Sequence, residues 1–341
     1  MSTKINVRSP YILVPAASPL DFATATLKLY IYDGVLTTNK PASASYTIVK
    51  SMPDQVDYYF DISELARDYI SQTSTAVWVE ADLSFDTSEP DEAYDYIAVD
   101  GFTEFEDGIN AQLSKNLMQS NTTIYNYSGQ TISIPVFSEG SLGDGIRVLF
   151  KLNGSTVSTA SITDSNDSDT KVAYATYAGD CDEARIEYYN SSEATWLLSD
   201  TITIEQVEEC KYTPYKIEFV NKFGSNQIIY AFKKSVQQLN VTGDMYKANT
   251  LTSTPSYSST GHQYKSYNVN GKEKITLNTG LVDGQNEVIR EMLLSEDVWV
   301  DDKPVTPTTK SFTYLTSVND GVINYTLEFD YAYDKVNSIR W

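Results

Sequence analysis

The chain has 341 residues, with 46 acidic side chains against 25 lysines and arginines, and a net charge of −21. A chain this acidic lacks the cations that neutralise nucleic-acid phosphates, so we expect no specific nucleic-acid binding. A single histidine, His262, and two cysteines are a poor supply for acid–base catalysis or zinc binding. We therefore expect neither enzymatic activity nor a cofactor. No run approaches the roughly 20 apolar residues that span a bilayer, so we expect no membrane partner.

The first third of the chain alternates apolar and polar residues, the pattern of half-buried strands. Its clearest example, 24–32, ends at Asp33-Gly34, a turn signal. Apolar residues at helical spacing in 61–70 predict one short helix, with Asp61 or Ser63 placed to cap its start. This pattern favours an immunoglobulin-like or fibronectin-like sandwich over 1–115. The predicted strands are 24–32, 44–50, 56–60, 76–85 and 93–99.

Residues 116–209 form a second predicted all-β stretch. Turn signals such as Asn153-Gly154 separate its alternating segments. We predict a second immunoglobulin-like sandwich here. Its predicted strands are 131–137, 146–152, 156–162, 171–177, 184–189 and 200–207.

The last third, 210–341, has a different pattern. Residues 215–234 predict two strands joined around Gly224, and 284–294 predict a helix. Four further strands, the first at 273–279, make this an α+β domain, which we assign to oligomerisation. The Ser/Thr/Tyr-rich stretch 248–268 is predicted to be a flexible arm or a hairpin that orders only on assembly.

Charge is distributed unevenly along the sequence. Residues 1–110 carry a net charge of −12 and residues 111–209 a net charge of −9, whereas 210–341 are neutral overall. We therefore expect the acidic part to face solvent and the neutral part to pack against copies of itself or other subunits.

Large aromatic and apolar side chains of the last third are the predicted interface residues. Tyrosine and tryptophan suit this role because they bury much area and keep a hydrogen-bonding tip. The alternative explanation is that these residues occur here only because aromatic residues favour β-strands. The candidates are Phe219, Phe223, Tyr230, Val288, Met292, Trp299, Tyr325, Tyr331 and Trp341.

Two oxygen-rich clusters are candidates for chemical sites. The run DSNDSDT at 164–170 has calcium-loop spacing, but it lacks the sixth-position glycine and the twelfth-position glutamate of an EF-hand. A solvated turn is the favoured interpretation over a weak calcium site at Asp164, Asn166, Asp167 and Asp169. Paired carboxylates among aromatics raise glycoside hydrolysis as an alternative, but acids on alternating strand positions ordinarily face water. These carboxylates are Asp95, Asp100, Glu104 and Glu106.

The two cysteines, Cys181 and Cys210, are too few for a disulfide framework at this length. Two reduced thiols are favoured over a single bridge between neighbouring strands.

Four segments resemble structural tail proteins of crAss-like phages, which infect Bacteroidetes-type bacteria. They are the opening NVRSPYILV at 6–14, the stretch 210–249 that begins CKYTPYKIEFVNKFG, the segment LNTGLVDGQNEVIREMLLSEDVWVDD at 277–302, and the ending INYTLEFDYAYDKVNSIR at 323–340. The resemblance is weaker across 120–208.

This resemblance implies a virion protein without catalytic residues, made in the host cytoplasm and built into the phage tail. It implies a ring-shaped homo-oligomer around a channel for DNA, with neighbouring tail and portal-proximal structural proteins as partners. Copy number and position in the tail stay open. The alternative function is a glycan-binding or adhesin module on the virion surface.

Overall fold

The computed structural model of this chain is mainly β, as the sequence predicts, with two α-helices and one 3-10 helix in the described part. Contacts divide the chain into two compact units. The first unit is Met1–Glu208, Glu218–Ile229 and Gly284–Ser295, and the second is Glu209–Ile217, Tyr230–Asp283 and Glu296–Trp341. The predicted domain 210–341 thus contributes segments to both units. The structure describes residues 3–16, 23–51, 58–70, 76–87, 89–111, 116–137, 145–162, 171–190, 192–209, 211–251, 255–309 and 322–336.

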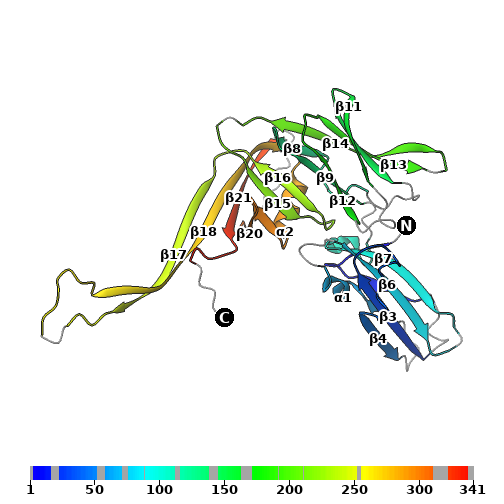
Figure 1. Cartoon of the computed structure of the whole chain (residues 1–341), viewed down its shortest axis with the longest axis horizontal. Coiled ribbons are helices and arrows are strands. Elements are labelled where there is room, and N and C mark those ends of the chain that lie inside the picture. The colour runs from blue at the N-terminus through cyan, green and yellow to red at the C-terminus, as the bar shows by residue number, and fades with distance from the viewer. Residues whose placement is uncertain are drawn as a thin grey trace. The chain divides into compact units, whose positions relative to one another are not determined.

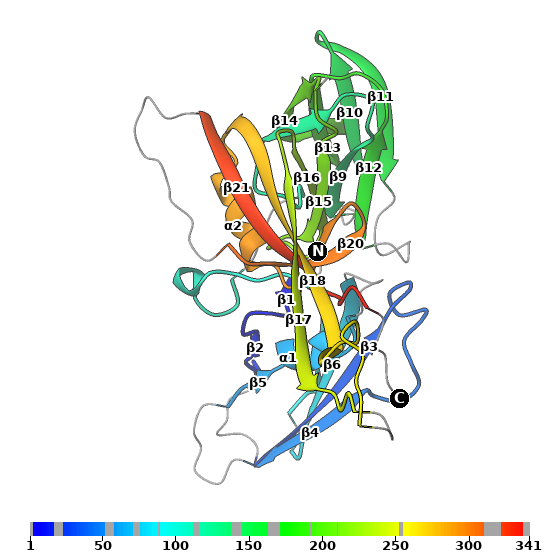
Figure 2. The ribbon, with the colours of Figure 1, turned by 90° about the vertical axis from the view of Figure 1, so that its left-hand side faces the viewer.

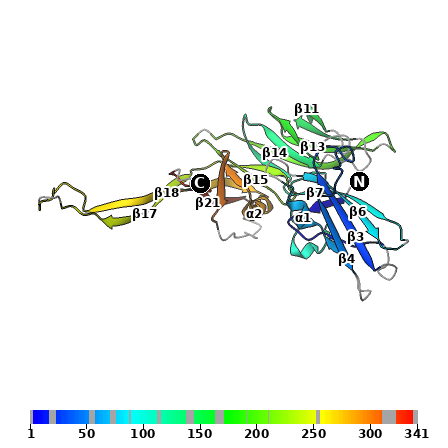
Figure 3. The same cartoon turned by 60° about the horizontal axis from the view of Figure 1, so that its bottom comes forward.

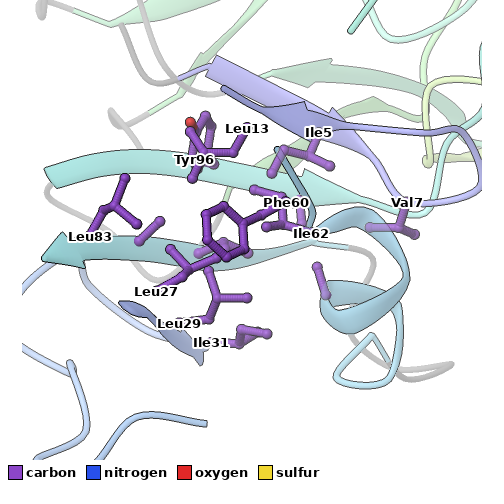
Figure 4. Packing of buried hydrophobic residues seen from close by; sticks show 14 of the residues in the cluster. Ile5, Val7, Leu13, Leu27, Leu29, Ile31, Phe60, Ile62, Leu83 and Tyr96 are labelled. Carbon is purple, nitrogen blue, oxygen red and sulfur yellow. The ribbon is translucent and has the colours of Figure 1, made fainter. Parts of the chain in front are cut away.

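The first part of unit 1 is a five-stranded sheet in the order β1-β7-β6-β3-β4, with a small β2–β5 pair. One face of this sheet packs with β2, β5 and α1 around Leu27, Leu29, Phe60 and Ile62, all at most 1% exposed (Figure 4). The alternation in the sequence produces this face, because every second residue of β3 and β6 points into the core. The elements are β1 (Thr3–Asn6), β2 (Ile12–Leu13), β3 (Thr24–Tyr32), β4 (Tyr46–Ser51), β5 (Phe60–Asp61), α1 (Ser63–Arg67), β6 (Ala76–Phe85) and β7 (Glu92–Val99).

The second part of unit 1 contains a five-stranded sheet, β11-β10-β13-β14-β8, and a two-stranded sheet, β12-β9. Figure 2 shows the two sheets beside each other, in green and teal. They share one apolar core, which includes Ile134, Val148, Phe150 and Ile186. The elements are η1 (Phe105–Asp107), β8 (Thr123–Tyr127), β9 (Ile132–Phe137), β10 (Ile146–Leu152), β11 (Ser155–Ile162), β12 (Val172–Tyr177), β13 (Glu183–Asn190) and β14 (Thr195–Val207).

A third core cluster holds unit 1 together. Trp78 and Val99 on the outer face of the first sheet pack with Phe137 of β9, Val172 of β12 and Phe223. Phe223 lies in the turn between β15 and β16, so a segment from the last third of the sequence completes this core.

The remaining strands form a seven-stranded sheet in the order β16-β15-β19-β20-β21-β18-β17, and the division between the units falls within β15 and β16. The predicted strands around Gly224 and the predicted helix near 284–294 are confirmed. The elements are β15 (Tyr215–Val220), β16 (Asn226–Ala231), β17 (Val236–Lys247), β18 (Tyr264–Asp283), α2 (Asn286–Leu294), β19 (Val298–Val300), β20 (Lys303–Pro307) and β21 (Val322–Tyr331).

Within unit 2, β17 and β18 form a long antiparallel ribbon. Figures 1 and 3 show the two strands side by side, extending past β20 and β21. Neither α-helix in the described part of the chain is long and apolar enough to cross a membrane.

Candidate assembly interface

Most of the predicted interface residues are used in the packing of a single copy. Six of them are between 0% and 6% exposed: Phe219, Phe223, Val288, Met292, Tyr325 and Tyr331. Tyr230 and Trp299 are half-buried, and Trp341 lies outside the described residues. Their size and apolar character therefore serve the fold of the monomer, and an interface role for them stays a prediction.

A concentration of exposed apolar side chains lies instead on β17 and the paired part of β18, which we call the arm. Every residue of Val236–Lys247 is exposed. The sequence pattern does not predict β17, and the predicted arm begins only at 248. In the structure, residues 264–268 belong to β18 and pair with Asp244–Lys247. The signal for β17 was present in its alternating Leu239, Val241 and Met245, but three apolar residues spaced by polar ones are a weak strand pattern.

The two faces of the arm differ in composition, although the first also carries Glu273 and Lys247. Register and alternation put Leu239, Val241 and Met245 on the same side of β17, with Tyr264 and Val269 from β18 beside them. We call these five residues the apolar arm face. They are 51%, 62%, 71%, 59% and 46% exposed, respectively. Soluble proteins rarely expose several large apolar side chains on one surface, and where they do, the surface ordinarily marks a binding site.

The opposite side, the polar arm face, carries amide, hydroxyl and charged groups. Tyr246 and Tyr267 share it, since their ring centroids lie 5.7 Å apart in an edge-to-face arrangement. Three lysines of β18 lie on this face, against one acid, Asp244 of β17. The lysines are Lys265, Lys272 and Lys274, and the neutral residues of β17 on this face include Gln238, Asn240 and Thr242.

The apolar arm face continues the core face of the sheet from which it projects. Ile275 pairs with Gln237 on the same side as Leu239, and it is fully buried. Further along β18, Leu277 pairs with Leu327 of β21, and both are at most 1% exposed. One sheet face is therefore covered at its base and bare along the arm, so the arm lacks the second layer that a half-buried sheet needs.

A bulge interrupts the ribbon between Thr242 and Asp244. The extra residue lies on β18, where Asn268 has φ +54 and its side-chain amide approaches the Asp244 carboxylate at 3.4 Å. Gly243 allows the close approach of Val269, because a Cβ there would lie 3.0 Å from the valine Cγ2. A bulge increases the twist of the strands, so the arm curves beyond this point.

Both edges of the outer arm lack a strand partner among the described residues. β17 is the last strand of its sheet. β18 pairs with β21 only from Lys274 onward, and the backbone N–H of Lys335 donates to the Gly271 carbonyl at 2.7 Å. The outer edge of β18 is thus open over 264–269. Natural sheets protect such edges with proline, charge or short length, whereas β17 has twelve residues, no proline and two charged side chains.

The described residues include no group of three or more His, Cys, Asp and Glu side chains able to hold a metal ion, and the candidate calcium ligands at 164–170 lie outside them. The carboxylates considered for glycoside hydrolysis lie on different elements of unit 1. Asp95 lies opposite Glu80 across β6 and β7, while Glu104 forms an ion pair with Arg290 and hydrogen-bonds within the η1 turn. Burial, followed by the Glu80 charge, raises the pKa of Asp95.

A depression of about 270 Å³ lies in unit 2, between the segment 212–215 and Lys233. It is smaller than ordinary ligand pockets, and the Lys233 ammonium is held by Glu209 at 2.6 Å. Cys181 is a buried free thiol, and Cys210 lies outside the described residues.

No protein-family model matches this sequence, and no curated protein is similar to it.

Proposed function

We propose that this chain is a structural virion protein that self-associates into a ring, as in the crAss-like phage tails that its sequence resembles. The two N-terminal parts act as immunoglobulin-like sandwiches, and the segments beyond residue 209 form an α+β assembly domain. Neighbouring tail and portal-proximal proteins are its further partners.

The observation that carries the proposal is the bare apolar face of the arm. An isolated two-stranded ribbon is marginally stable in water, and this one has no second layer of its own. Its sequence nevertheless keeps five large apolar residues on one side. Such a surface ordinarily marks a place where another molecule binds, and a subunit of an oligomer uses it to bind the next copy.

The energetics favour a ring over a single pairwise contact. Covering five half-exposed apolar side chains contributes about 1 kcal/mol each, roughly half the value of full burial. This is comparable with the cost of immobilising two proteins, about 4–15 kcal/mol, so one such contact alone binds weakly. In a closed ring each copy makes two contacts. The contact that closes the ring forms within one assembly, so it does not carry the cost of immobilising another free copy.

The charge distribution fits a role around DNA without binding it. The first 209 residues hold 32 acids and 11 bases. A channel wall formed by such a surface repels the phosphate backbone, which lets DNA slide through.

The test is the mass and shape of the purified full-length chain, by light scattering together with negative-stain imaging. We expect closed rings of many copies with a central opening. A monomer at every concentration, or an open aggregate without symmetry, would overturn the proposal.

A further inference from the structure

The open edges of the arm are complementary to each other. β17 and β18 run antiparallel within one copy. When two arms lie side by side in the same orientation, β17 of one therefore lies antiparallel to β18 of the other. Each arm then offers one edge to the copy on either side, and a row of arms continues without a break.

Charge distinguishes this arrangement from its alternatives. Pairing β18 with β18 along their open edges would bring Lys265 of two copies close together on the polar arm face, and like charges on neighbouring strands destabilise a sheet. Pairing β17 with β18 places Lys265 of one copy beside β17 of the next, whose side chains on this face include the neutral Gln238 and Asn240 and the acidic Asp244. The one acid on the polar arm face among the described residues thus lies on the strand that meets Lys265. Pairing β17 with β17 has no charge conflict but leaves both β18 edges open.

The apolar arm face supports the same arrangement. Joining β17 to β18 puts Val241 and Met245 of one copy on the same side as Tyr264 and Val269 of the next. Aromatic and β-branched side chains on adjacent strands stabilise a sheet by roughly 0.2–1 kcal/mol per pair. The apolar faces then form one continuous layer around the ring.

We propose that the arms of neighbouring copies pair edge to edge, β17 of one copy with residues 264–269 of the next, and close a cylinder of strands. This inference rests on the proposed self-association and specifies its contact. A closed cylinder has no open edge, which accounts for a long strand that carries so little edge protection.

Inter-copy disulfides test the arrangement directly. Two versions of the full chain are made in a background with Cys181→Ala and Cys210→Ala. One carries Asn240→Cys on β17, and the other carries Lys265→Cys on β18 with a different affinity tag. Gln238→Cys and Thr242→Cys replace Asn240→Cys in parallel mixtures, so that the neighbouring registers are sampled. The matched control replaces Lys265→Cys with Lys28→Cys, which is exposed on β3.

After mixing, assembly and mild oxidation, we expect a disulfide between the differently tagged chains, at least about tenfold above the Lys28→Cys mixture, since directly opposed strand residues lie within disulfide reach. Disulfides between two Asn240→Cys chains, or between two Lys265→Cys chains, would show same-strand pairing and overturn the inference. Rings without any inter-arm disulfide overturn it while leaving the proposed function standing. A monomer overturns both.

Amide hydrogen exchange provides an independent readout without substitutions in the arm. Along a two-stranded ribbon, alternate amides of β17 face the open edge and exchange with water. In the assembled protein we expect consecutive residues of Val236–Lys247 to be protected. Protection of alternate residues only, in an assembled ring, would contradict edge pairing.

Discussion

The side-chain amide of Asn221 donates a 2.7 Å hydrogen bond to the backbone carbonyl of Met118, 103 residues earlier in the chain. The Ser225 hydroxyl donates to the same carbonyl at 2.7 Å, and the Asn221 side-chain oxygen accepts from the backbone N–H groups of Phe223 and Ser225. Asn221 and Ser225 are both 0% exposed. The β15–β16 turn is therefore fixed to the segment that precedes β8, and this buried polar network stabilises unit 1.

Replacing Asn221 with alanine should destabilise unit 1 strongly. The substitution removes the hydrogen bonds of the amide and leaves the buried N–H groups of Phe223 and Ser225 without that acceptor, at a cost of about 2–4 kcal/mol. Urea denaturation followed by tryptophan fluorescence measures the change. Asn240→Ala on the exposed arm is the matched control and should change stability by less than about 0.5 kcal/mol. Equal effects of the two substitutions would show that the network contributes nothing.

Gly224 should tolerate no side chain. Its φ is +75, and a Cβ there would lie 2.7 Å from the backbone nitrogen of Asp100, which has little freedom to shift. Gly129 has a similar φ, +83, with open space around it. Gly129→Ala therefore measures the cost of the left-handed backbone alone, about 1–2 kcal/mol. Gly224→Ala should cost at least twice as much in chemical denaturation, and a similar cost for both would show that the backbone contact relaxes.

Glu291 should make the stability of unit 1 depend on pH. Its carboxyl is 1% exposed, and burial raises its pKa, although the Ser120 hydroxyl and the Lys222 ammonium at 3.6 Å act in the opposite direction. Because the folded state favours the protonated form, this contribution is complete below the unfolded pKa of about 4.3 and is lost as pH rises through the folded pKa.

Glu291→Gln removes this dependence. The free energy of unfolding of the wild type, relative to the variant, should therefore fall as pH rises from about 4 towards neutrality. Urea denaturation across this range gives the difference at each pH, with Glu64→Gln, at an exposed position of α1, as the control. A difference that stays constant with pH would contradict the assignment.

Cys181 should be unreactive in the folded protein. Burial, followed by the charges of Asp182 and Asp180, raises the pKa of its thiol to about 11, so the reactive thiolate is scarce near neutral pH. In a Cys210→Ser background, a thiol reagent such as Ellman's should label Cys181 only after unfolding. Rapid labelling of the folded protein would show that the core around β10 and β13 opens readily.

The longer strands of unit 1 could be predicted from sequence because their two faces have different environments, whereas β8 was not predicted. β6 and β10 occupy the predicted ranges, since alternate residues such as Val77, Val79 and Leu83 point into one core. The same reasoning could not separate interface from core. Phe219 and Met292 are residue types that occur in both protein cores and interfaces, and only the folded chain shows that both are buried.

The arm and the buried polar network were harder to predict for opposite reasons. Val236–Lys247 lacks a buried face in one copy, so its pattern of apolar residues is sparse. Asn221, Ser225 and Gln227 are polar residue types that are ordinarily exposed, yet they are buried together. Their spacing in the sequence carries no sign of the hydrogen bonds to Met118 and Asn121 that make this burial favourable.

The most direct measurement compares the solution mass of three proteins: the wild type, Val241→Lys with Met245→Lys on the apolar arm face, and Asn240→Glu with Thr242→Glu on the polar arm face. Both variants place two charges on the same exposed strand, and the carboxylates of the polar-face variant lie on the side that carries the β18 lysines, so they bring no like charges together. We predict a closed oligomer for the wild type and the polar-face variant, and a folded monomer with the wild-type unfolding midpoint for the apolar-face variant. An apolar-face variant with the wild-type mass, or a wild type that is itself monomeric, would contradict assembly through the arm.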